Sequence, residues 1–175
     1  MKIIILGAPG SGKGTQARLL AKKLKLKHIV ASDLIKKEIS KKNENARLIN
    51  LYLKQGKLIP DKIVDSIIKE NIQKNNFILD GYPRTIEQAE FLNKLNKPDK
   101  IILLDTPDKI LKERLLKRAK IENRIDDKLS IIKIRLEVYK KEIKPLLDYY
   151  KKNLIKINGD NHQESIKNQI LKALK

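Results

Sequence analysis

The chain has 175 residues, no cysteine and a formal net charge of +19. This length suits one domain with a sizeable core, to which small lobes can be appended. The lack of cysteine excludes a disulfide scaffold and fits a reducing, cytoplasmic setting. A strand pattern begins at the N-terminus and no apolar run approaches membrane-spanning length, so we expect neither a signal peptide nor a membrane anchor.

The strong positive charge raises the question of nucleic-acid binding. However, the lysines are scattered along the whole chain, Phe and Tyr are few, and Trp is absent. The interleaving of basic and aromatic residues that grips single strands is missing. We therefore interpret the charge as a solvated, lysine-rich surface and expect no nucleic-acid partner. Nothing in the sequence indicates an oligomeric state.

The arginines are more informative than the total charge. The chain has 33 Lys and only 7 Arg, so it uses lysine where charge alone is needed. Arginine has a planar fork that suits bidentate phosphate binding or stacking on a base. Five of the seven arginines fall in one part of the chain: Arg84, Arg114, Arg118, Arg124 and Arg135. This clustering predicts a site for phosphates.

The first predicted element is a buried strand over Lys2–Leu6, followed by the glycine-rich stretch Gly7–Gln16 (GAPGSGKGTQ) and a helical pattern. Strand, glycine-rich turn and helix are the context of a phosphate-binding P-loop. Its backbone N–H groups and the helix N-terminus cradle an anion, and Lys13 adds a mobile charge. A plain strand-to-helix turn explains one or two glycines but does not explain the lysine. In the general pattern a hydroxyl follows the lysine directly to hold Mg²⁺, whereas here Gly14 intervenes and the hydroxyl comes at Thr15.

Further apolar runs predict four more strands, and the stretches between them have helical periodicity. This alternation predicts an α/β fold with a five-stranded parallel sheet and helices on both faces. In such folds ligands bind beyond the carboxyl ends of the strands. The four strands are expected over Lys27–Val30, Phe77–Leu79, Ile101–Leu104 and Leu154–Ile157. We assign His28 to its strand and not to catalysis.

Boundary signals place several helix ends. Ser32 or Asp33 fits the N-cap of the helix after the second strand. Farther along, Gly56 fits a helix C′ position and Pro60 fits the first position of the next helix. Thr106 fits the N-cap of the helix after the fourth strand.

The stretch Phe77–Gln88 (FILDGYPRTIEQ) contains the second chemical motif. An apolar strand that ends in Asp80 has the form of a Walker B element, whose carboxylate holds Mg²⁺ or its water. Gly81 and Pro83 predict a rigid turn that aims Arg84 across the top edge of the sheet. The alternative is that Arg84 is only a salt-bridge partner.

The remaining arginines lie on a predicted helical hairpin. Arg114 and Arg118 are four residues apart, so both face one way. After a short polar loop over 119–127, the next helix has a predicted buried stripe, and Arg135 lies off that stripe. The stripe consists of Ile132, Leu136, Tyr139, Ile143, Leu146 and Tyr150. An ordinary charged hairpin does not explain why a chain that prefers lysine has four arginines here.

These motifs resemble the adenylate kinase family of nucleoside monophosphate kinases, and the resemblance covers the whole chain. The matching stretches are the P-loop Gly7–Gln16, the turn Asp80–Thr85 and the arginine pattern from 114 to 135. The resemblance implies a three-layer fold of the P-loop NTPase type. It also implies a core over 1–30, 61–118 and 128–175, a monophosphate-binding lobe over 31–60, and a short lid over 119–127 without a zinc site.

The resemblance further implies Mg²⁺-dependent, reversible phosphoryl transfer from ATP to AMP, giving two ADP. The implied catalytic residues are Lys13, Arg84, Arg118, Arg124 and Arg135. The implied ATP-binding residues are Gly10, Ser11, Gly12, Lys13, Gly14, Thr15, Arg118, Asn161 and, stacked on the adenine, Arg114. The implied AMP-binding residues are Ala31, Lys36, Leu58, Ile59, Gly81, Arg84, Gln88, Arg124 and Arg135. The implied metal contacts are Asp80, through water, and the Thr15 hydroxyl.

Within this family two residues disagree about the acceptor base. Ala31 matches UMP/CMP kinases, which are the second candidate, whereas Gln88 offers the donor and acceptor that adenine requires. A buried polar pair decides specificity more strongly than a missing hydroxyl at a pocket wall, so we expect AMP to be preferred. The alternative for Gln88 is a solvent-facing helix residue. Lys36 keeps the charge of the family's arginine but not its fork. A nucleic-acid-associated P-loop ATPase, supported by the charge alone, is the third candidate.

Overall fold

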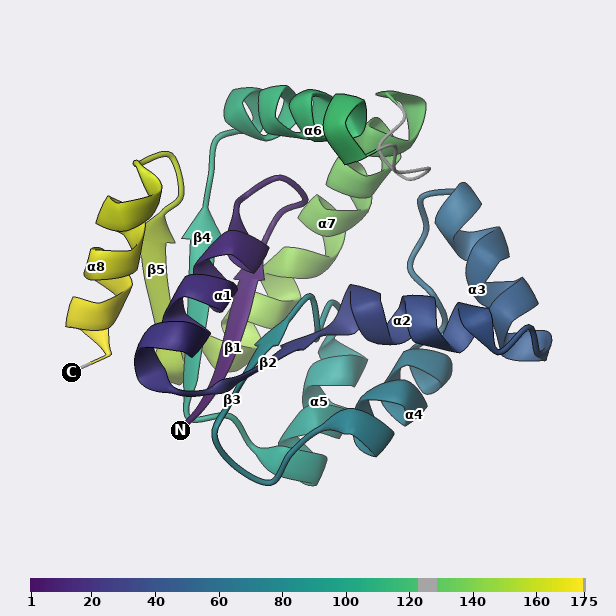
Figure 1. Cartoon of the computed structure of the whole chain (residues 1–175), viewed down its shortest axis with the longest axis horizontal. Coiled ribbons are helices and arrows are strands. Elements are labelled where there is room, and N and C mark those ends of the chain that lie inside the picture. The colour runs from purple at the N-terminus through teal and green to yellow at the C-terminus, as the bar shows by residue number, and fades with distance from the viewer. Residues whose placement is uncertain (123–128, 175) are drawn as a thin grey trace.

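The computed structural model describes residues 1–122 and 129–174. Strands and helices alternate along the chain, as Figure 1 shows. In chain order the elements are β1 (Lys2–Gly7), α1 (Lys13–Leu24), β2 (Lys27–Val30), α2 (Ala31–Ser40), α3 (Glu44–Lys54), α4 (Asp61–Asn71), β3 (Phe77–Asp80), α5 (Ile86–Asn96), β4 (Lys100–Asp105), α6 (Asp108–Glu122), α7 (Leu129–Tyr150), the 3₁₀ turn η2 (Lys151–Asn153), β5 (Leu154–Asn158) and α8 (Gln163–Ala173). Every predicted strand is present, and most extend one residue past a predicted end.

The strands form one parallel sheet in the order β2-β3-β1-β4-β5. The central strand β1 lies between β3 and β4, with Ile5 opposite Asp80 and Gly7 opposite Leu104. The chain therefore builds β2 and β3 on one side of β1, and β4 and β5 on the other. The end of β1 is the switch point at which open α/β sheets bind ligands, and the P-loop follows it directly.

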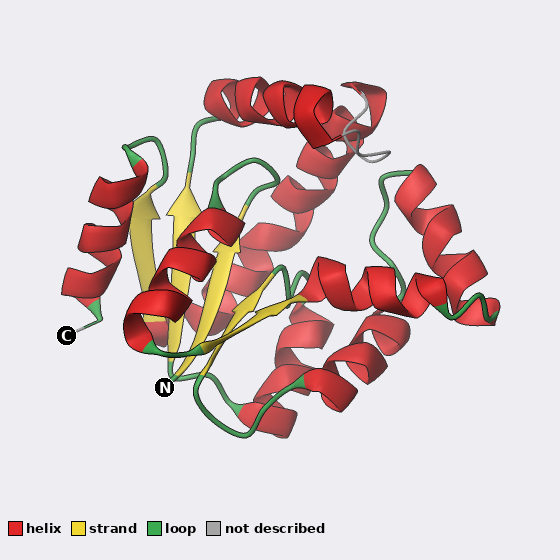
Figure 2. Ribbon diagram, in the orientation of Figure 1, coloured by secondary structure: helices red, strands yellow, loops and turns green. Residues whose placement is uncertain are grey.

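Alternate residues of β1 supply two cores, one on each face of the sheet. Ile3 and Ile5 pack with α1 and α8, whereas Ile4 and Leu6 belong to the cluster that includes α4, α5 and α7. Figure 2 shows helices covering both sides of the strands. Full burial of each isoleucine stabilises the fold by about 1.5–3 kcal/mol. The predicted three-layer α/β fold is confirmed.

A third, smaller core joins α6 to α7 above the P-loop. In Figure 1, α6 crosses over the carboxyl ends of the strands, and α7 runs down behind the sheet. The shared cluster consists of Ala8, Leu111, Leu115, Ile132 and Leu136. Of the predicted stripe on α7, Leu146 and Tyr150 are also buried, whereas Tyr139 and Ile143 are partly buried. The stripe therefore serves two cores, one at each end of the helix.

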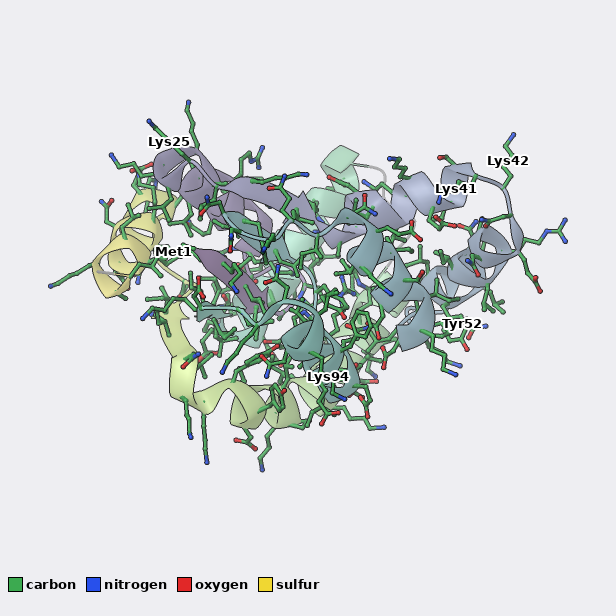
Figure 3. All side chains as sticks on the ribbon, turned by 90° about the horizontal axis from the view of Figure 1, so that it is seen from below. Met1, Lys25, Lys41, Lys42, Tyr52 and Lys94 are labelled. Carbon is green, nitrogen blue, oxygen red and sulfur yellow. The ribbon has the colours of Figure 1, made fainter. Side chains whose placement is uncertain are left out.

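Lysines lie in separate parts of the molecule. In Figure 3, Lys25 and Lys42 lie near opposite ends of the molecule, and Lys94 lies between them. Among the helices of the described residues, none combines the length and the apolar character needed to cross a membrane.

The start of α2 differs from the prediction. The helix begins at Ala31, and the extended residue Val30 occupies the N-cap without a side-chain hydrogen bond. The prediction that Ser32 or Asp33 caps this helix is therefore wrong. Strand β2 leads into α2 with no intervening loop, so the last strand residue, Val30, is the N-cap, and its apolar side chain cannot accept a hydrogen bond.

The turn between α3 and α4 follows the prediction at Gly56 but not at Pro60. Gly56 has a φ of 68°, its N–H donates to the Leu53 carbonyl, and the Lys57 N–H donates to the Tyr52 carbonyl. This pattern is a Schellman motif with glycine at C′. Pro60 occupies the N-cap of α4, one position earlier than predicted, because its ψ of 132° is extended.

Thr106 does not cap α6, so that prediction is also wrong. The helix begins at Asp108, and the buried Thr106 Oγ1 has no hydrogen-bond partner in the described part of the chain. The side chain packs instead against the turn after β5. A Cβ added at Gly159 would lie only 2.1 Å from Thr106 Oγ1. Close approach of two loops, and not capping, therefore explains the position of this threonine.

Candidate active site

The loop between β1 and α1 is shaped by its own backbone. Gly10 and Gly12 have φ values of 85° and 88°, and Gly12 is the N-cap of α1. The Ser11 N–H donates to the Ala8 carbonyl at 3.0 Å. A Cβ at Gly10 would meet the Leu111 carbonyl of α6 at 2.9 Å, so a side chain fits neither the backbone nor the space. The result is a tight, curled loop beneath α6 with the N-terminus of α1 open toward it, which is an anion-binding arrangement.

Lys13 lies at the centre of the charged groups of the site. Its Nζ donates to the Ala8 carbonyl at 3.3 Å. Burial, together with three nearby arginine charges, lowers the pKa of Lys13 to about 8, although the Asp80 charge opposes the shift. These arginines are Arg84 from the turn after β3, Arg135 from α7 and Arg118 from α6. Residues that the sequence places far apart thus lie within electrostatic reach of one lysine, and their catalytic roles remain predictions.

Asp80, at the end of β3, lies against the first turn of α1. A Cβ at Gly14 would lie 3.1 Å from Asp80 Oδ2, so glycine keeps this approach open. The same helical turn contains Thr15, the candidate metal-binding hydroxyl. His28 lies in β2 as predicted, and its Nε2 is 3.7 Å from Asp80 Oδ2, a contact that the sequence did not indicate.

Arg114 connects the P-loop to the turn after β5. Its Nη1 donates to the Gly159 carbonyl at 2.9 Å and approaches the Ser11 carbonyl at 3.4 Å. Asn161 lies exposed in the same turn. The structure therefore brings Arg114 to the edge of the P-loop, and its stacking on the adenine of ATP remains a prediction.

The turn after β3 brings Ala31 and Arg84 together around Gly81. Gly81 has a φ of 83°, and a Cβ there would lie 3.6 Å from Arg84 Nη2 and 3.7 Å from the Ala31 Cβ. Arg84 Nε donates to the Gly81 carbonyl at 2.9 Å. Two predicted acceptor-binding residues thus flank the same turn, beside the carboxyl end of β3.

Gln88 is buried, so the alternative that it faces solvent is wrong. Its Oε1 accepts from the Arg84 backbone N–H at 2.8 Å, and its Nε2 donates to Asp61 Oδ1 at 2.6 Å. Thr85 caps α5 by accepting from the Gln88 N–H at 3.2 Å. The spacing Thr-x-x-Gln is a capping-box signal that could have predicted this cap. No local signal indicates the partner Asp61, because it comes from α4.

The other predicted acceptor residues have mixed surroundings. Lys36 is exposed on α2, with its Nζ 3.6 Å from Asp33 Oδ1. Leu58 is partly buried, and Ile59 belongs to the main core beside α4. Arg124 lies outside the described residues, as does most of the predicted lid.

A curled loop that presents N–H groups to phosphates, surrounded by arginines from three elements, suits the transfer of a phosphoryl group. The switch-point topology of the sheet and the glycine-rich loop after β1 together define a P-loop nucleotide-binding fold. A sequence model of the family described as Adenylate kinase matches residues 5–155. The adenylate kinase of Rickettsia conorii is 40% identical over 210 aligned residues, covering 100% of this chain and 99% of that protein. The adenylate kinase of Rickettsia prowazekii is 39% identical over 211 aligned residues, with the same coverage.

The chain therefore belongs to the adenylate kinase family and is a phosphotransferase. Its alignment with the Rickettsia conorii protein spans 210 positions, whereas the chain has 175 residues. That relative accordingly contains segments that this chain lacks.

Proposed function

We propose that the protein transfers the terminal phosphoryl group of ATP reversibly to AMP, giving two ADP, and that it acts in the cytoplasm. The proposal rests on one observation: Arg84, Arg118 and Arg135 lie within electrostatic reach of Lys13 in the P-loop. Such a site neutralises the charge of two phosphate groups that must approach each other, which is the main requirement of phosphoryl transfer. The lack of cysteine fits a reducing compartment.

In the transfer step, an oxygen of the AMP phosphate forms a bond to the γ-phosphorus of ATP. The bond from that phosphorus to the oxygen shared with the β-phosphate breaks, and ADP leaves with the electron pair. The P-loop N–H groups and Lys13 bind the outer phosphates of ATP, and Arg84 binds the acceptor phosphate. Arg118, Arg124 and Arg135 stabilise the charge that spreads over the transferred oxygens.

Magnesium is the cation we propose to accompany ATP. The open approach between Gly14 and Asp80 fits this ion, because Mg²⁺ is commonly held by one carboxylate, waters and substrate phosphates. Asp80, through water, and the Thr15 hydroxyl would hold it, and when bound it neutralises phosphate charge. No group of three or more His, Cys, Asp or Glu side chains that could hold a metal occurs in the described residues. Because the chain has no cysteine, we propose that the lid contains no zinc.

We assign the monophosphate-binding lobe to residues 31–60, the short lid to 119–127, and the core to 1–30, 61–118 and 128–175. In support, α2 and α3 extend away from the sheet in Figure 1, to the side of the acceptor turn. The segments that the Rickettsia conorii relative has in addition fit the short form of the lid. Closure of the two lobes would exclude water, which otherwise competes with AMP for the phosphoryl group.

AMP is the proposed acceptor because the Gln88 amide has both a donor and an acceptor, as adenine requires. The second candidate acceptors are UMP and CMP, which Ala31 favours. In support, Ala31 lies against the turn after β3, since a Cβ added at Gly81 would be 3.7 Å from the Ala31 Cβ. Gln88 and Ala31 therefore predict opposite orders of kcat/KM for AMP against CMP and UMP.

Turnover of the purified protein with Mg·ATP and each of AMP, CMP and UMP tests the proposal. We expect two ADP per AMP consumed, loss of activity with EDTA, and no loss with a zinc-selective chelator. We expect kcat/KM for AMP to exceed that for CMP and UMP by at least about tenfold. A higher kcat/KM with CMP or UMP would contradict the choice of AMP, and ATP hydrolysis without phosphoryl transfer would contradict the kinase assignment.

A further inference from the structure

Helix α4 holds the turn over residues 81–88 through its first carboxylate. Asp61 Oδ1 accepts from Gln88 Nε2 at 2.6 Å, and Asp61 Oδ2 accepts from the Thr85 hydroxyl at 3.0 Å. On its other side, Gln88 Oε1 accepts from the Arg84 backbone N–H at 2.8 Å. Both polar atoms of the Gln88 amide therefore have partners inside the protein, and only 2% of the residue is exposed.

The two partners fix the direction in which the Gln88 amide points. A carboxylate only accepts hydrogen bonds and a backbone N–H only donates, so one orientation of the amide satisfies both. In the reversed orientation, Gln88 Oε1 would face the Asp61 carboxylate and Nε2–H would face the Arg84 N–H. Both contacts would then be repulsive, and the buried groups would lose their partners.

We propose that Asp61 is a specificity-determining residue, which positions the Gln88 amide so that the enzyme accepts 6-amino purines and rejects 6-oxo purines. This inference rests on the proposed role of Gln88 at the acceptor base. Each amide atom keeps one further bonding capacity, a second hydrogen on Nε2 and a second lone pair on Oε1. Adenine offers the matching pair, a 6-amino donor and the N1 acceptor.

A 6-oxo purine such as hypoxanthine or guanine offers the reverse pair, a C6 carbonyl acceptor and an N1–H donor. A glutamine that turns freely accommodates either pair by rotating its amide, so glutamine alone discriminates poorly. Asp61 and the Arg84 N–H together prevent that rotation. The 6-oxo base then meets acceptor against acceptor and donor against donor, which a polar site rejects strongly.

The second carboxylate of α4 provides a matched control. Asp65 lies one turn after Asp61, and its Oδ1 accepts from the Tyr82 hydroxyl at 2.6 Å. The Tyr82 hydroxyl also donates to the backbone carbonyl of Gln88 at 3.1 Å. Asp65 therefore helps to hold the same turn to the same helix, but its bond does not involve the Gln88 amide. A loss of general support affects variants at both positions, whereas a loss of amide orientation affects only Asp61.

The experiment compares AMP with IMP, which has a 6-oxo group and an N1–H in place of the 6-amino group and N1. Values of kcat/KM with Mg·ATP are measured for wild type, Asp61→Ala, Asp61→Asn, Asp65→Ala and Gln88→Ala. Where IMP turnover is too slow, its inhibition constant against AMP replaces it. We expect Asp61→Ala to lower the AMP-to-IMP ratio at least about tenfold, because a released amide can rotate to suit the 6-oxo base. Asp65→Ala should stay within about threefold of wild type, whereas Asp61→Asn, whose amide can present either a donor or an acceptor to Gln88, should lower the ratio less than Asp61→Ala does.

Other outcomes overturn the inference in distinguishable ways. If Gln88→Ala lowers the ratio and Asp61→Ala does not, Gln88 reads the base but Asp61 does not orient it. If neither lowers the ratio, the proposed role of Gln88 fails as well. Equal losses in Asp61→Ala and Asp65→Ala would show general support of the turn instead of orientation. Circular dichroism confirms folding, and Asp61→Ser, which suits the first turn of a helix, replaces Asp61→Ala if that variant is unfolded.

Discussion

The proposed donor and acceptor sides of the candidate active site are built by different means. The donor loop, residues 7–12, takes its form from glycines in left-handed conformations and from the N-terminus of α1. The acceptor turn, residues 81–88, is held by side chains, because Asp61 and Asp65 of α4 accept hydrogen bonds from residues of the turn. Backbone N–H groups recognise phosphate, which every nucleotide has. Side chains can distinguish one base from another, and a single substitution can change which base they bind.

The largest loss of activity is expected from a substitution in the P-loop, on the proposed donor side. Lys13→Met removes the charge that serves the outer phosphates and should lower kcat on the order of a thousandfold. The fold should persist, because methionine fills the same partly buried space and the P-loop backbone is formed by its glycines. Turnover with Mg·ATP and AMP, with a melting curve as the control, checks this. Near wild-type turnover would remove the P-loop from the mechanism.

The next largest loss of rate is expected for the arginines that we propose bind the transferred phosphoryl group. Arg135→Lys keeps the charge and loses the planar fork, so the rate of transfer should fall at least about tenfold if both prongs bind phosphate oxygens. Single-turnover measurements separate this effect from product release. The same result is expected for Arg124→Lys. A rate within about threefold of wild type, less than the loss of one charged hydrogen bond, would indicate a structural arginine.

The pH dependence should distinguish the free donor site from the occupied one. Because the pKa of Lys13 is lowered to about 8, the free enzyme loses this charge above that pH. Values of kcat/KM for ATP should therefore fall above pH 8, whereas kcat should fall less because bound phosphates favour the protonated lysine. A parallel decline of both parameters would contradict this.

The same shift predicts a change of stability with a definite sign. Between about 8 and the ordinary value of 10.5, the unfolded chain retains the Lys13 proton and the folded protein does not. The unliganded protein therefore gains stability as pH rises through this range. Lys13→Met should lack that gain, which denaturant titrations of both proteins at pH 7.5 and 10 would measure.

The smallest effect is expected at the acceptor side. Burial and the nearby charge of Asp61 raise the pKa of Asp65, although the Tyr82 hydrogen bond opposes them, so the ionised carboxylate costs stability at neutral pH. Asp65→Asn keeps an acceptor for Tyr82 and should stabilise the protein at pH 7, by no more than about 0.5 kcal/mol because water screens the partly exposed group. The gain should vanish below the ordinary pKa of 3.8, where wild-type Asp65 is protonated. Destabilisation at pH 7 would show that the charge itself holds the turn.

The contrast between the P-loop and the turn over residues 81–88 also separates what the sequence predicts from what it does not. The P-loop and the five strands have local signals, namely glycine spacing and apolar runs, so their positions follow from the residues themselves. The Gln88 network depends on Asp61, 27 residues earlier, and no local pattern indicates that contact. The errors at Ser32 and Thr106 have a similar origin, since neighbouring strands and turns left no room for side-chain caps. Propensity was correct where structure is local and failed where packing decides.

A crystal structure with a bisubstrate dinucleotide, in which a phosphate chain joins two adenosines, tests the central claim most directly. We predict that the phosphate chain lies on the P-loop N–H groups and Lys13, with Arg84 at its acceptor end. The acceptor adenine should form hydrogen bonds with the Gln88 amide while Gln88 remains bonded to Asp61 and to the Arg84 N–H. An acceptor adenine out of reach of Gln88, or an amide that has broken from Asp61 to meet it, would contradict the account.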